Sequence, residues 1–429
     1  MQSIEKAKRL NIAVVGGGIA GITAAYQLQK AHHVSLFEAN DYVGGHTNTR
    51  VIPDGPDAGT PVDTGFIVLN DRTYPILNRF FDKLNVRIQK SDMSFSYFSE
   101  RTGFQYASQN FNSLFAQRGN LLDPGYWWVL GEILSFNRKV QRGLRRGTLG
   151  ALTLGEFLRR FNFSERFKRQ YVFPMVAAIW SAPDAQVDQF PMLTFARFFS
   201  NHGLLNVTNQ PQWYYVAGGS QTYVRAFLKQ FDGDVHTQTP LESIARRPEG
   251  VVLQTTGGET HRFDRVIIAT HADQALKLLA DPSALEKRLL GPWRYSVNET
   301  FLHTDTRWMP ANRRAWASWN FFRAEGVGAQ APVTLTYHMN RLQQLHTDRQ
   351  YLVTLNPFKP IAEDKIVARM TYTHPTFTFE SLGTQRDLPR LNGKRNTAFC
   401  GSYFRYGFHE DAARSGVLAA AALGVPYEF

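Results

Sequence analysis

Three glycines near the start of the chain are spaced for binding a nucleotide phosphate. Gly16 and Gly18 follow an apolar run, residues 11–15, and Gly21 comes three residues later. At this spacing the first glycine permits a tight turn and the second lets the backbone approach a pyrophosphate. The third lets a helix pack closely on a strand. The free N–H groups and the dipole at the start of that helix would then hold the phosphates.

A carboxylate completes this pattern. Glu38 follows Gly21 by 17 residues and stands at the end of a second apolar run, His33–Phe37. A carboxylate in this place accepts hydrogen bonds from ribose hydroxyls and disfavours the 2′-phosphate of NADP. Residues 22–31 have helical spacing, so we expect a strand, a glycine turn, a helix and a strand. The first forty residues therefore predict a dinucleotide site.

A second glycine pair, Gly44 and Gly45, follows soon after the carboxylate. This arrangement resembles the extended signature of the amine oxidase and phytoene desaturase superfamily of flavoproteins. The resemblance implies FAD as the cofactor. Members of that superfamily carry Arg where this chain has His46, so the role of the Arg does not transfer directly. An ordinary loop turn at the glycine pair is the alternative interpretation.

In that superfamily the FAD domain is assembled from three separated stretches, and segments of this chain resemble all three. Pro61–Leu69 resembles the segment along the flavin, Tyr215–Ser220 begins the middle piece, and Thr397–Ser402 begins the last. The resemblance implies that the following residues bind the cofactor: Gly16, Gly18, Ile19, Ala20, Gly21, Glu38, Ala39, Gly44, Gly45, His46, Thr47, Thr64, Gly65, Phe66, Leu241, Gly401, Glu410, Asp411 and Ala412.

The resemblance assigns different parts of FAD to these segments. The residues from Thr64 to Phe66 would face the isoalloxazine ring, Leu241 the adenine edge, and Gly401 the ribityl chain. The helix that follows, with its positive end, would stabilise a negatively charged reduced flavin. Relatives usually carry Gly at the position of Asp411, and we expect its carboxylate to cap the helix instead.

These segments must be positioned by an α/β fold, a Rossmann-like FAD-binding domain with a mixed helix-plus-sheet substrate domain. We expect residues 75–205 to be mainly helical and residues 295–375 to be mainly strands. The predicted divisions are 1–72, 209–282 and 393–429 for the FAD-binding parts, 73–208 for a helical cap, and 283–392 for a β-rich substrate region.

Two pairs of residues in the β-rich region are candidates for chemistry: Tyr337 with His338, and Tyr372 with His374. A flavin that oxidises or reduces a C–C bond needs its N5 atom near the reacting carbon and a dry cavity, and an acid or base can assist. Packed or hydrogen-bonded structural residues are the alternative for each of the four. The sequence has no Gly-x-Ser-x-Gly elbow and no metal-ligand motif, so neither a hydrolase nor a metal site is expected.

Charge and composition limit the partners. The chain of 429 residues has a net charge of +12 but no nucleic-acid-binding motif, which favours an anionic membrane or acidic ligand. Residues 126–146 place Trp127, Trp128, Ile133, Leu134 and Phe136 before five cationic side chains. They predict an interfacial helix that contacts lipid, or else a core helix with a basic end.

The expected cellular location rests on three features of the sequence. No apolar run is long enough to span a bilayer, no signal peptide is recognisable, and Cys400 is the single cysteine. We therefore expect a cytoplasmic protein that associates with membranes.

Several short strings look most like a bacterial subfamily of flavoproteins related to monoamine oxidase. They begin at Asp63, Asp92, Ala178, His202, Trp316 and Gly407. Members of this subfamily occur beside methyltransferases of the cyclopropane-fatty-acid-synthase type, which suggests a lipid acyl chain as substrate and such a methyltransferase as partner. The hypotheses are hydride transfer to or from an acyl carbon, amine oxidation, and a non-catalytic lipid-binding flavoprotein.

Overall fold

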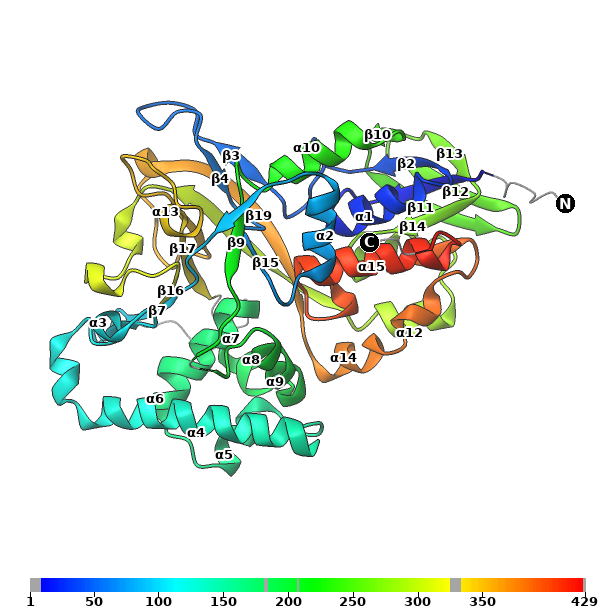
Figure 1. Ribbon diagram of the computed structural model, residues 1–429. Coiled ribbons are helices and arrows are strands. Elements are labelled where there is room, and N and C mark those ends of the chain that lie inside the picture. The colour runs from blue at the N-terminus through cyan, green and yellow to red at the C-terminus, as the bar shows by residue number, and fades with distance from the viewer. Residues whose placement is uncertain (1–8, 181–183, 207, 325–332, 427–429) are drawn as a thin grey trace, which may run out of the picture.

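The computed structural model describes residues 9–180, 184–206, 208–324 and 333–426. Figure 1 shows a sheet-and-helix region near both ends of the chain, a second sheet beside it, and a helical region below. The string that begins at Ala178 ends at Ser181, which lies outside the described residues. Among the described residues, no helix is long and apolar enough to cross a membrane.

A five-stranded parallel sheet forms the centre of the first region, with the order β10-β2-β1-β14-β20. Its strands, in chain order, are β1 (Asn11–Val15), β2 (His33–Phe37), β10 (Asp234–His236), β14 (Arg265–Ile268) and β20 (Thr397–Phe399). The three stretches predicted to build the FAD domain therefore meet in one sheet. The predicted α/β fold is confirmed, while the residue boundaries between its domains stay a prediction.

Alternate residues of β1 cover opposite faces of this sheet. Val14 packs with the helices α1 (Ile19–Leu28) and α15 (His409–Ala422) on one face. Ala13 packs on the other face with a three-stranded antiparallel sheet, made of β11 (Leu241–Arg247), β12 (Gly250–Thr255) and β13 (Thr260–Phe263). The first helix begins and ends three residues earlier than the predicted range of 22–31, because Gly18 already serves as its N-cap.

The second region is a seven-stranded mixed sheet in the order β19-β15-β18-β17-β16-β7-β8. Neighbouring strands are antiparallel except β7 and β16, which are parallel. The strands are β7 (Phe95–Ser99), β8 (Gln105–Ala107), β15 (Arg294–His303), β16 (Trp319–Arg323), β17 (Thr334–His338), β18 (Leu352–Leu355) and β19 (Ile366–Thr376). The expectation that residues 295–375 are mainly strands is confirmed.

Short strands and two helices connect the regions. Two small antiparallel sheets pair β3 (Thr49–Val51) with β4 (Pro61–Asp63), and β9 (Trp213–Val216) with β5 (Val68–Asn70) and β6 (Ile88–Lys90). The connecting helices are α2 (Pro75–Lys83), which packs on α15, and α10 (Gln221–Gln230).

The helical region is built on one long helix, α4 (Pro124–Arg146). Asp123 caps its start by accepting a hydrogen bond from Tyr126 N at 3.2 Å, and Gly147 ends it at a φ of +66°. Its companions are α3 (Phe111–Leu114), α5 (Leu154–Arg160), α6 (Glu165–Phe167), a π-helical turn (Lys168–Val172), α7 (Phe173–Trp180), α8 (Asp184–Asp188) and α9 (Met192–Asn201). Shorter helices elsewhere are α11 (Ala272–Leu278), α12 (Ala284–Leu290), α13 (Met339–Leu342) and α14 (Phe379–Gln385).

Residues 75–205 are mainly helical, as expected, although β6, β7 and β8 occupy the part between 88 and 107. β6 pairs with β9 and β7 pairs with β16, both far along the chain, so local periodicity gave no sign of these strands. One expectation about this region is corrected. Phe136, expected at a membrane interface, is fully buried among aromatic rings of the core.

Candidate active site

The glycine loop between β1 and α1 has the geometry of a phosphate cradle. Gly16 adopts a φ of +107°, and its N–H donates to Phe37 O at 2.8 Å. A Cβ at Gly21 would lie 1.9 Å from Gly16 O, so no side chain fits there. A Cβ at Gly18 would meet nothing within 4 Å, which leaves open space at the start of α1. The loop therefore fits a dinucleotide phosphate at the helix N-terminus.

Glu38 is fixed beside this loop. One carboxylate oxygen accepts a hydrogen bond from Gly17 N at 2.8 Å, and the other accepts from Asn40 N at 2.9 Å. The carbonyl of Glu38 accepts from Thr239 N at 2.9 Å, which brings the segment leading to Leu241 alongside it. The structure thus brings two predicted cofactor positions, one for ribose and one for adenine, to the same end of the sheet.

The second glycine pair lies across the first loop. Gly44 N donates to Gly17 O at 2.9 Å, and a Cβ at Gly45 would lie 3.1 Å from Gly18 Cα. Beyond the pair, the backbone of His46 contacts Gly65, where a Cβ would lie 2.1 Å from the His46 carbonyl oxygen. These contacts join the loop 44–47 to the segment 64–66, as the resemblance implied.

The imidazole of His46 lies in a cluster of rings. Its centroid is 5.1 Å from Tyr372, 5.6 Å from His374 and 6.4 Å from His271. Its Nε2 is buried and, among the described residues, has no hydrogen-bond partner. Burial lowers the pKa of His46 and His271 to about 4 and that of His374 to about 3, so these imidazoles are neutral at pH 7.

Tyr372 joins this cluster to the segment expected to face the flavin. The hydroxyl of Thr64 donates to Asn48 O at 2.8 Å, so the Tyr372 hydroxyl donates to Thr64 Oγ1, at 2.7 Å. His374 lies two residues further along β19 and therefore on the same face of the strand. Asn298 Nδ2 donates to its Nδ1 at 3.3 Å. The pair Tyr372 and His374 is thus placed beside the predicted cofactor segments.

The carboxylates at the start of α15 act as caps. Asp411 accepts hydrogen bonds from Phe408 N at 3.1 Å and Tyr406 N at 3.2 Å, so the expected capping role is confirmed. Glu410 accepts from Ile76 N at 3.0 Å and Leu77 N at 2.9 Å, at the start of α2. Burial raises the pKa of Asp411 to about 6 and that of Glu410 to about 7. Each cap satisfies two backbone donors at a helix start.

The other candidate pair lies elsewhere. His338 Nε2 donates to Gln350 Oε1 at 2.7 Å, and the ring lies edge-on to Trp316 at 5.5 Å. Tyr337 lies against Trp319, with 5.1 Å between ring centroids. In the part of the chain that the structure describes, no ring contact or hydrogen bond joins either residue to the histidine cluster. Their candidacy for chemistry is therefore not supported by geometry.

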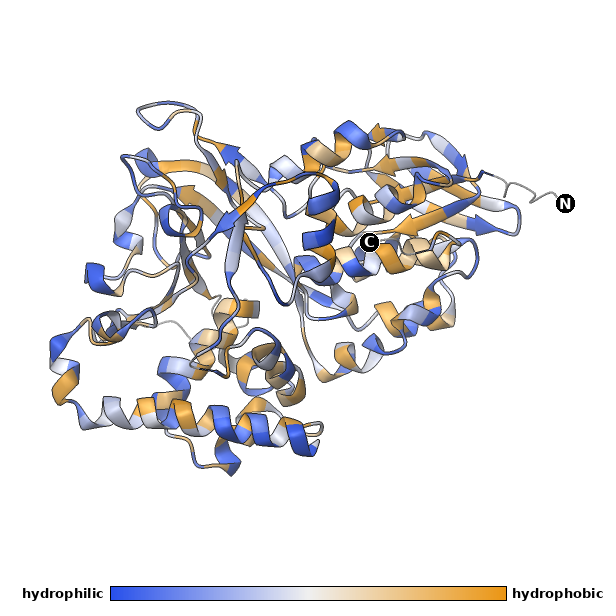
Figure 2. Ribbon diagram, in the orientation of Figure 1, coloured by the Kyte–Doolittle hydropathy of each residue, from blue (hydrophilic) through white to orange (hydrophobic). Residues whose placement is uncertain are grey.

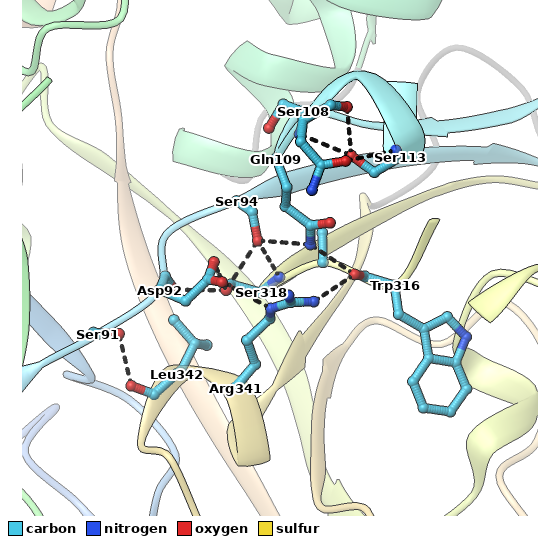
Figure 3. A network of polar contacts seen from close by, with 12 residues as sticks. Ser91, Asp92, Ser94, Ser108, Gln109, Ser113, Trp316, Ser318, Arg341 and Leu342 are labelled. Atoms are coloured by element: carbon cyan, nitrogen blue, oxygen red, sulfur yellow. Dashed lines mark hydrogen bonds and ion pairs between the residues drawn. The ribbon is translucent and has the colours of Figure 1, made fainter. Parts of the chain in front are cut away.

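A polar network around Asp92, Ser318 and Arg341 lies at the start of the parallel pair β7 and β16 (Figure 3). The backbone N–H of His338 donates to Ser318 O at 2.9 Å, and Ser318 Oγ donates to Asp92 O at 2.6 Å. Arg341 binds the Asp92 carboxylate at 3.0 Å and the carbonyl of Trp316 at 2.8 Å. The segments that begin at Asp92 and at Trp316 both resemble the bacterial subfamily, and in the structure they contact each other.

The comparisons with known proteins agree with this geometry. The family model described as flavin containing amine oxidoreductase matches residues 19–424. The chain belongs to that family. It is 24% identical over 297 residues to the 15-cis-phytoene desaturase of Glycine max, a match covering 64% of this chain and 50% of the soybean enzyme. The chain thus spans about half the length of that curated relative.

Solved structures share the fold of this flavin-containing amine oxidoreductase. Cyclohexylamine oxidase from Brevibacterium oxydans matches with a TM-score of 0.69 and 16% identity, over 97% of this chain and 99% of that one. A CLA-producing fatty acid isomerase from P. acnes matches with a TM-score of 0.68 and 16% identity, over 96% of this chain and 98% of that one. At these identities the matches establish the fold.

Membership makes the protein an FAD-dependent oxidoreductase. The open space at Gly18 and the closed contacts at Gly16 and Gly21 fit a bound dinucleotide. Assignment of individual cofactor contacts to residues stays a prediction. Gly401 keeps its predicted place at the end of β20, where its N–H donates to Ser415 Oγ at 2.8 Å. No group of three or more His, Cys, Asp or Glu among the described residues could hold a metal ion.

Sequence reasoning missed several members of the site. His271 lies three residues after the end of β14, and its ring stacks on Tyr295 at 4.2 Å. Asn298 is 1% exposed and contacts His374. Gly416 lets α15 approach α1, since a Cβ there would lie 2.1 Å from Ala20 O. A signal existed for His271, because it closely follows the apolar run Val266–Ala269, and ligands of such sheets bind at the carboxyl ends of the parallel strands.

Proposed function

We propose that this flavoenzyme transfers a hydride between flavin N5 and a carbon of a lipid acyl chain, as a desaturase or saturase of membrane fatty acids. The main observation behind this proposal is that the carboxylates of the segments expected to face the flavin accept hydrogen bonds from other groups of the chain. An acyl chain presents no charge, so a site of neutral imidazoles and aromatic rings suits it.

Asp63 illustrates how these carboxylates are bound. It is fully buried, and its oxygens accept hydrogen bonds from Ser220 N at 2.8 Å, Thr49 Oγ1 at 2.6 Å and Gln343 Nε2 at 3.1 Å. Glu410 and Asp411 likewise accept hydrogen bonds from backbone N–H groups. All three carboxylates are thus buried and bound by donors of the chain, which disfavours their use in binding the ammonium of an amine.

The apolar side of the site supports the same substrate class. Trp180 lies 4.6 Å from Phe190 and 4.8 Å from Phe198 between ring centroids, and its indole N–H donates to Tyr406 O at 3.4 Å. Phe198 in turn stacks on Phe408 at 4.8 Å, just before α15. These rings would exclude water from a reacting acyl chain.

FAD supplies the hydride acceptor or donor for this chemistry. His374 is the proposed base or acid: in desaturation its Nδ1 would take up the proton released from the neighbouring carbon and give up the hydrogen bond from Asn298. Asn298 would hold the His374 ring before that step, while Tyr372 would hold Thr64 and the neighbouring ring of His46. Tyr337 and His338 have no part in the proposal.

Relatives support both the proposal and its rival. The P. acnes structure is titled a fatty acid isomerase and the soybean relative is named a desaturase, whereas another structure of equal similarity is named an amine oxidase. We keep amine oxidation as the alternative. The subfamily resemblance also supports a cyclopropane-synthase-like methyltransferase as a partner, with a non-catalytic lipid-binding role as the third possibility.

Anaerobic spectroscopy of the purified holoprotein tests the proposal. Oxidised enzyme mixed with saturated phospholipid should lose its flavin absorbance if desaturation occurs. Photoreduced enzyme mixed with unsaturated phospholipid should regain it if saturation occurs. Bleaching by primary amines, with neither lipid active, would establish the rival. A flavin inert to all of these compounds would overturn the enzymatic proposal in favour of the supporting role.

A further inference from the structure

The long helix α4 lies along an outer edge of the molecule, away from the five-stranded sheet (Figure 1). Its inner face is buried in the core through Val129, Phe136 and Val140. The two halves of its outer face differ along the helix axis, and Figure 2 shows hydrophilic residues concentrated in the second, C-terminal half. The sequence singled out this helix, and the proposed reaction does not use it.

The first half of α4 adjoins an exposed apolar surface, here named the apolar end: Phe111 (62% exposed), Leu121 (38%), Leu122 (88%), Trp127 (46%) and Trp128 (69%). Phe115 joins two of its members, because its ring lies 4.6 Å from Phe111 and 5.0 Å from Trp127. The Trp127 indole N–H donates to Leu121 O at 3.0 Å. Exposed aliphatic and aromatic side chains gathered in this way mark an interaction surface.

The second half carries exposed arginines, here named the basic end: Arg138, Arg142, Arg145 and Arg146. Their spacing of three and four residues continues the outward stripe from Leu134, which is 48% exposed. None of the four is in an ion pair with any described residue. The single carboxylate of α4, Glu132, is buried and accepts hydrogen bonds from Ser164 N and Oγ.

We propose that α4 docks this protein on an anionic lipid bilayer. The apolar end would enter the boundary between headgroups and acyl chains, where tryptophan is favoured, and the basic end would bind lipid phosphates. The charge pattern favours a bilayer over a second copy of the chain, because a second copy would bring another four arginines to the interface. None of these side chains belongs to the flavin-facing segments, so the contact does not depend on the proposed reaction.

A cavity beside the basic end supplies a second observation. Its volume is about 580 Å³, and its lining includes Arg138, Asn137, Leu134 and Leu205. A phosphatidylglycerol headgroup in this cavity would place its phosphate at the guanidinium of Arg138. The docking surface therefore also offers a seat for one anionic headgroup.

Vesicle flotation of the full-length holoprotein tests the contact. We expect binding to vesicles of 7:3 phosphatidylcholine and phosphatidylglycerol, at least tenfold weaker binding to pure phosphatidylcholine, and release by high salt. Replacing all four arginines of the basic end by Gln should weaken binding to the anionic vesicles at least tenfold. Leu122→Asp with Trp128→Asp should weaken it comparably.

A matched control replaces Arg225, Lys229, Arg247 and Arg262 by Gln, which removes the same net charge from exposed positions of the FAD-binding region. It should bind vesicles like the wild type. Flavin absorbance and melting temperature of each variant report intact folding. Equal loss in both quadruple variants, or no loss in either, would overturn the proposal. A different occupant of this surface would also overturn the proposal. In that case the wild type would not bind vesicles, and light scattering would show a dimer that dissociates in the variant with Leu122→Asp and Trp128→Asp.

Discussion

The ring of His409 lies flat against Phe66, with 3.8 Å between centroids and 4° between planes. His409 is the first residue of α15, and its Nε2 lies 3.0 Å from Thr47 Oγ1. One imidazole thus contacts both N-terminal segments that are predicted to hold FAD. Burial keeps its pKa well below the ordinary value, so the ring is a neutral packing element.

Removing this ring should weaken the binding of FAD. His409→Ala deletes a stacked pair and a hydrogen-bond partner, interactions worth together about 2 kcal/mol. We expect the dissociation constant of FAD to rise about tenfold, measured by flavin fluorescence as apoprotein is titrated. His409→Phe keeps the stack and should show a smaller rise. Unchanged affinity in both variants would mean that the contact does not organise the cofactor segments.

The glycine cradle makes a sharper prediction. Gly21→Ala places a methyl group 1.9 Å from the Gly16 carbonyl oxygen, so the loop must shift and the purified protein should lack flavin absorbance. Gly131→Ala is the matched control, because a Cβ on that exposed turn of α4 meets nothing within 4 Å. It should retain FAD and gain up to about 1 kcal/mol of stability. Flavin-to-protein absorbance ratios check both outcomes.

The N-terminal elements could be predicted because their signals are local. β1 and β2 have the predicted bounds, since apolar runs, a glycine turn and a terminal carboxylate lie within forty residues. β7 was missed because its partners, β16 and β8, include a strand more than two hundred residues away. A short strand of this kind is specified by its neighbours rather than by its own sequence.

One of the two candidate pairs lies beside the predicted cofactor segments and the other does not, and strand alternation explains the difference. Tyr372 and His374 are two residues apart, so one face of a strand presents both. Tyr337 and His338 are adjacent and must point to opposite faces, so they could not both face one site. The position of the cluster around His46 was not predictable, since it depends on three segments that meet only in the folded chain.

Helical spacing could likewise have corrected the expectation for α4. Val129, Phe136 and Val140 repeat at intervals that place them on one face, and the structure buries them. Trp128 and Leu134 fall on the opposite face and are exposed. Of the two interpretations left open by the sequence, the structure shows the buried face of a core helix, while the exposed face is the one that we propose to bind lipid.

The two histidines of the substrate sheet should differ in catalysis. His374→Gln is expected to slow anaerobic flavin reduction, or reoxidation in the opposite direction, about a hundredfold. His338→Gln should slow it less than threefold, since its ring binds Gln350 away from the cluster. Because the pKa of His374 is lowered to about 3, the wild-type rate should show no imidazole titration between pH 5.5 and 8. Similar rates for both variants would remove His374 from the chemistry.

Stability should depend on pH through His303, which is fully buried and uses both ring nitrogens. Nδ1 accepts from Asp305 N at 3.1 Å, so Nε2 carries the proton and donates to Thr354 Oγ1 at 2.7 Å. Burial lowers its pKa from 6.5 to about 4. The unfolded chain therefore takes up a proton first as pH falls, and the native state loses stability between pH 6.5 and 4.

His303→Gln isolates this effect, because glutamine offers one donor and one acceptor but does not titrate. The free energy of unfolding of the wild type, relative to the variant, should fall by about 2 kcal/mol between pH 7 and 4.5. Denaturant titrations of both proteins at each pH measure this difference, and the other buried groups titrate alike in both. Parallel curves would mean that the pKa of His303 is the same in the folded and the unfolded chain.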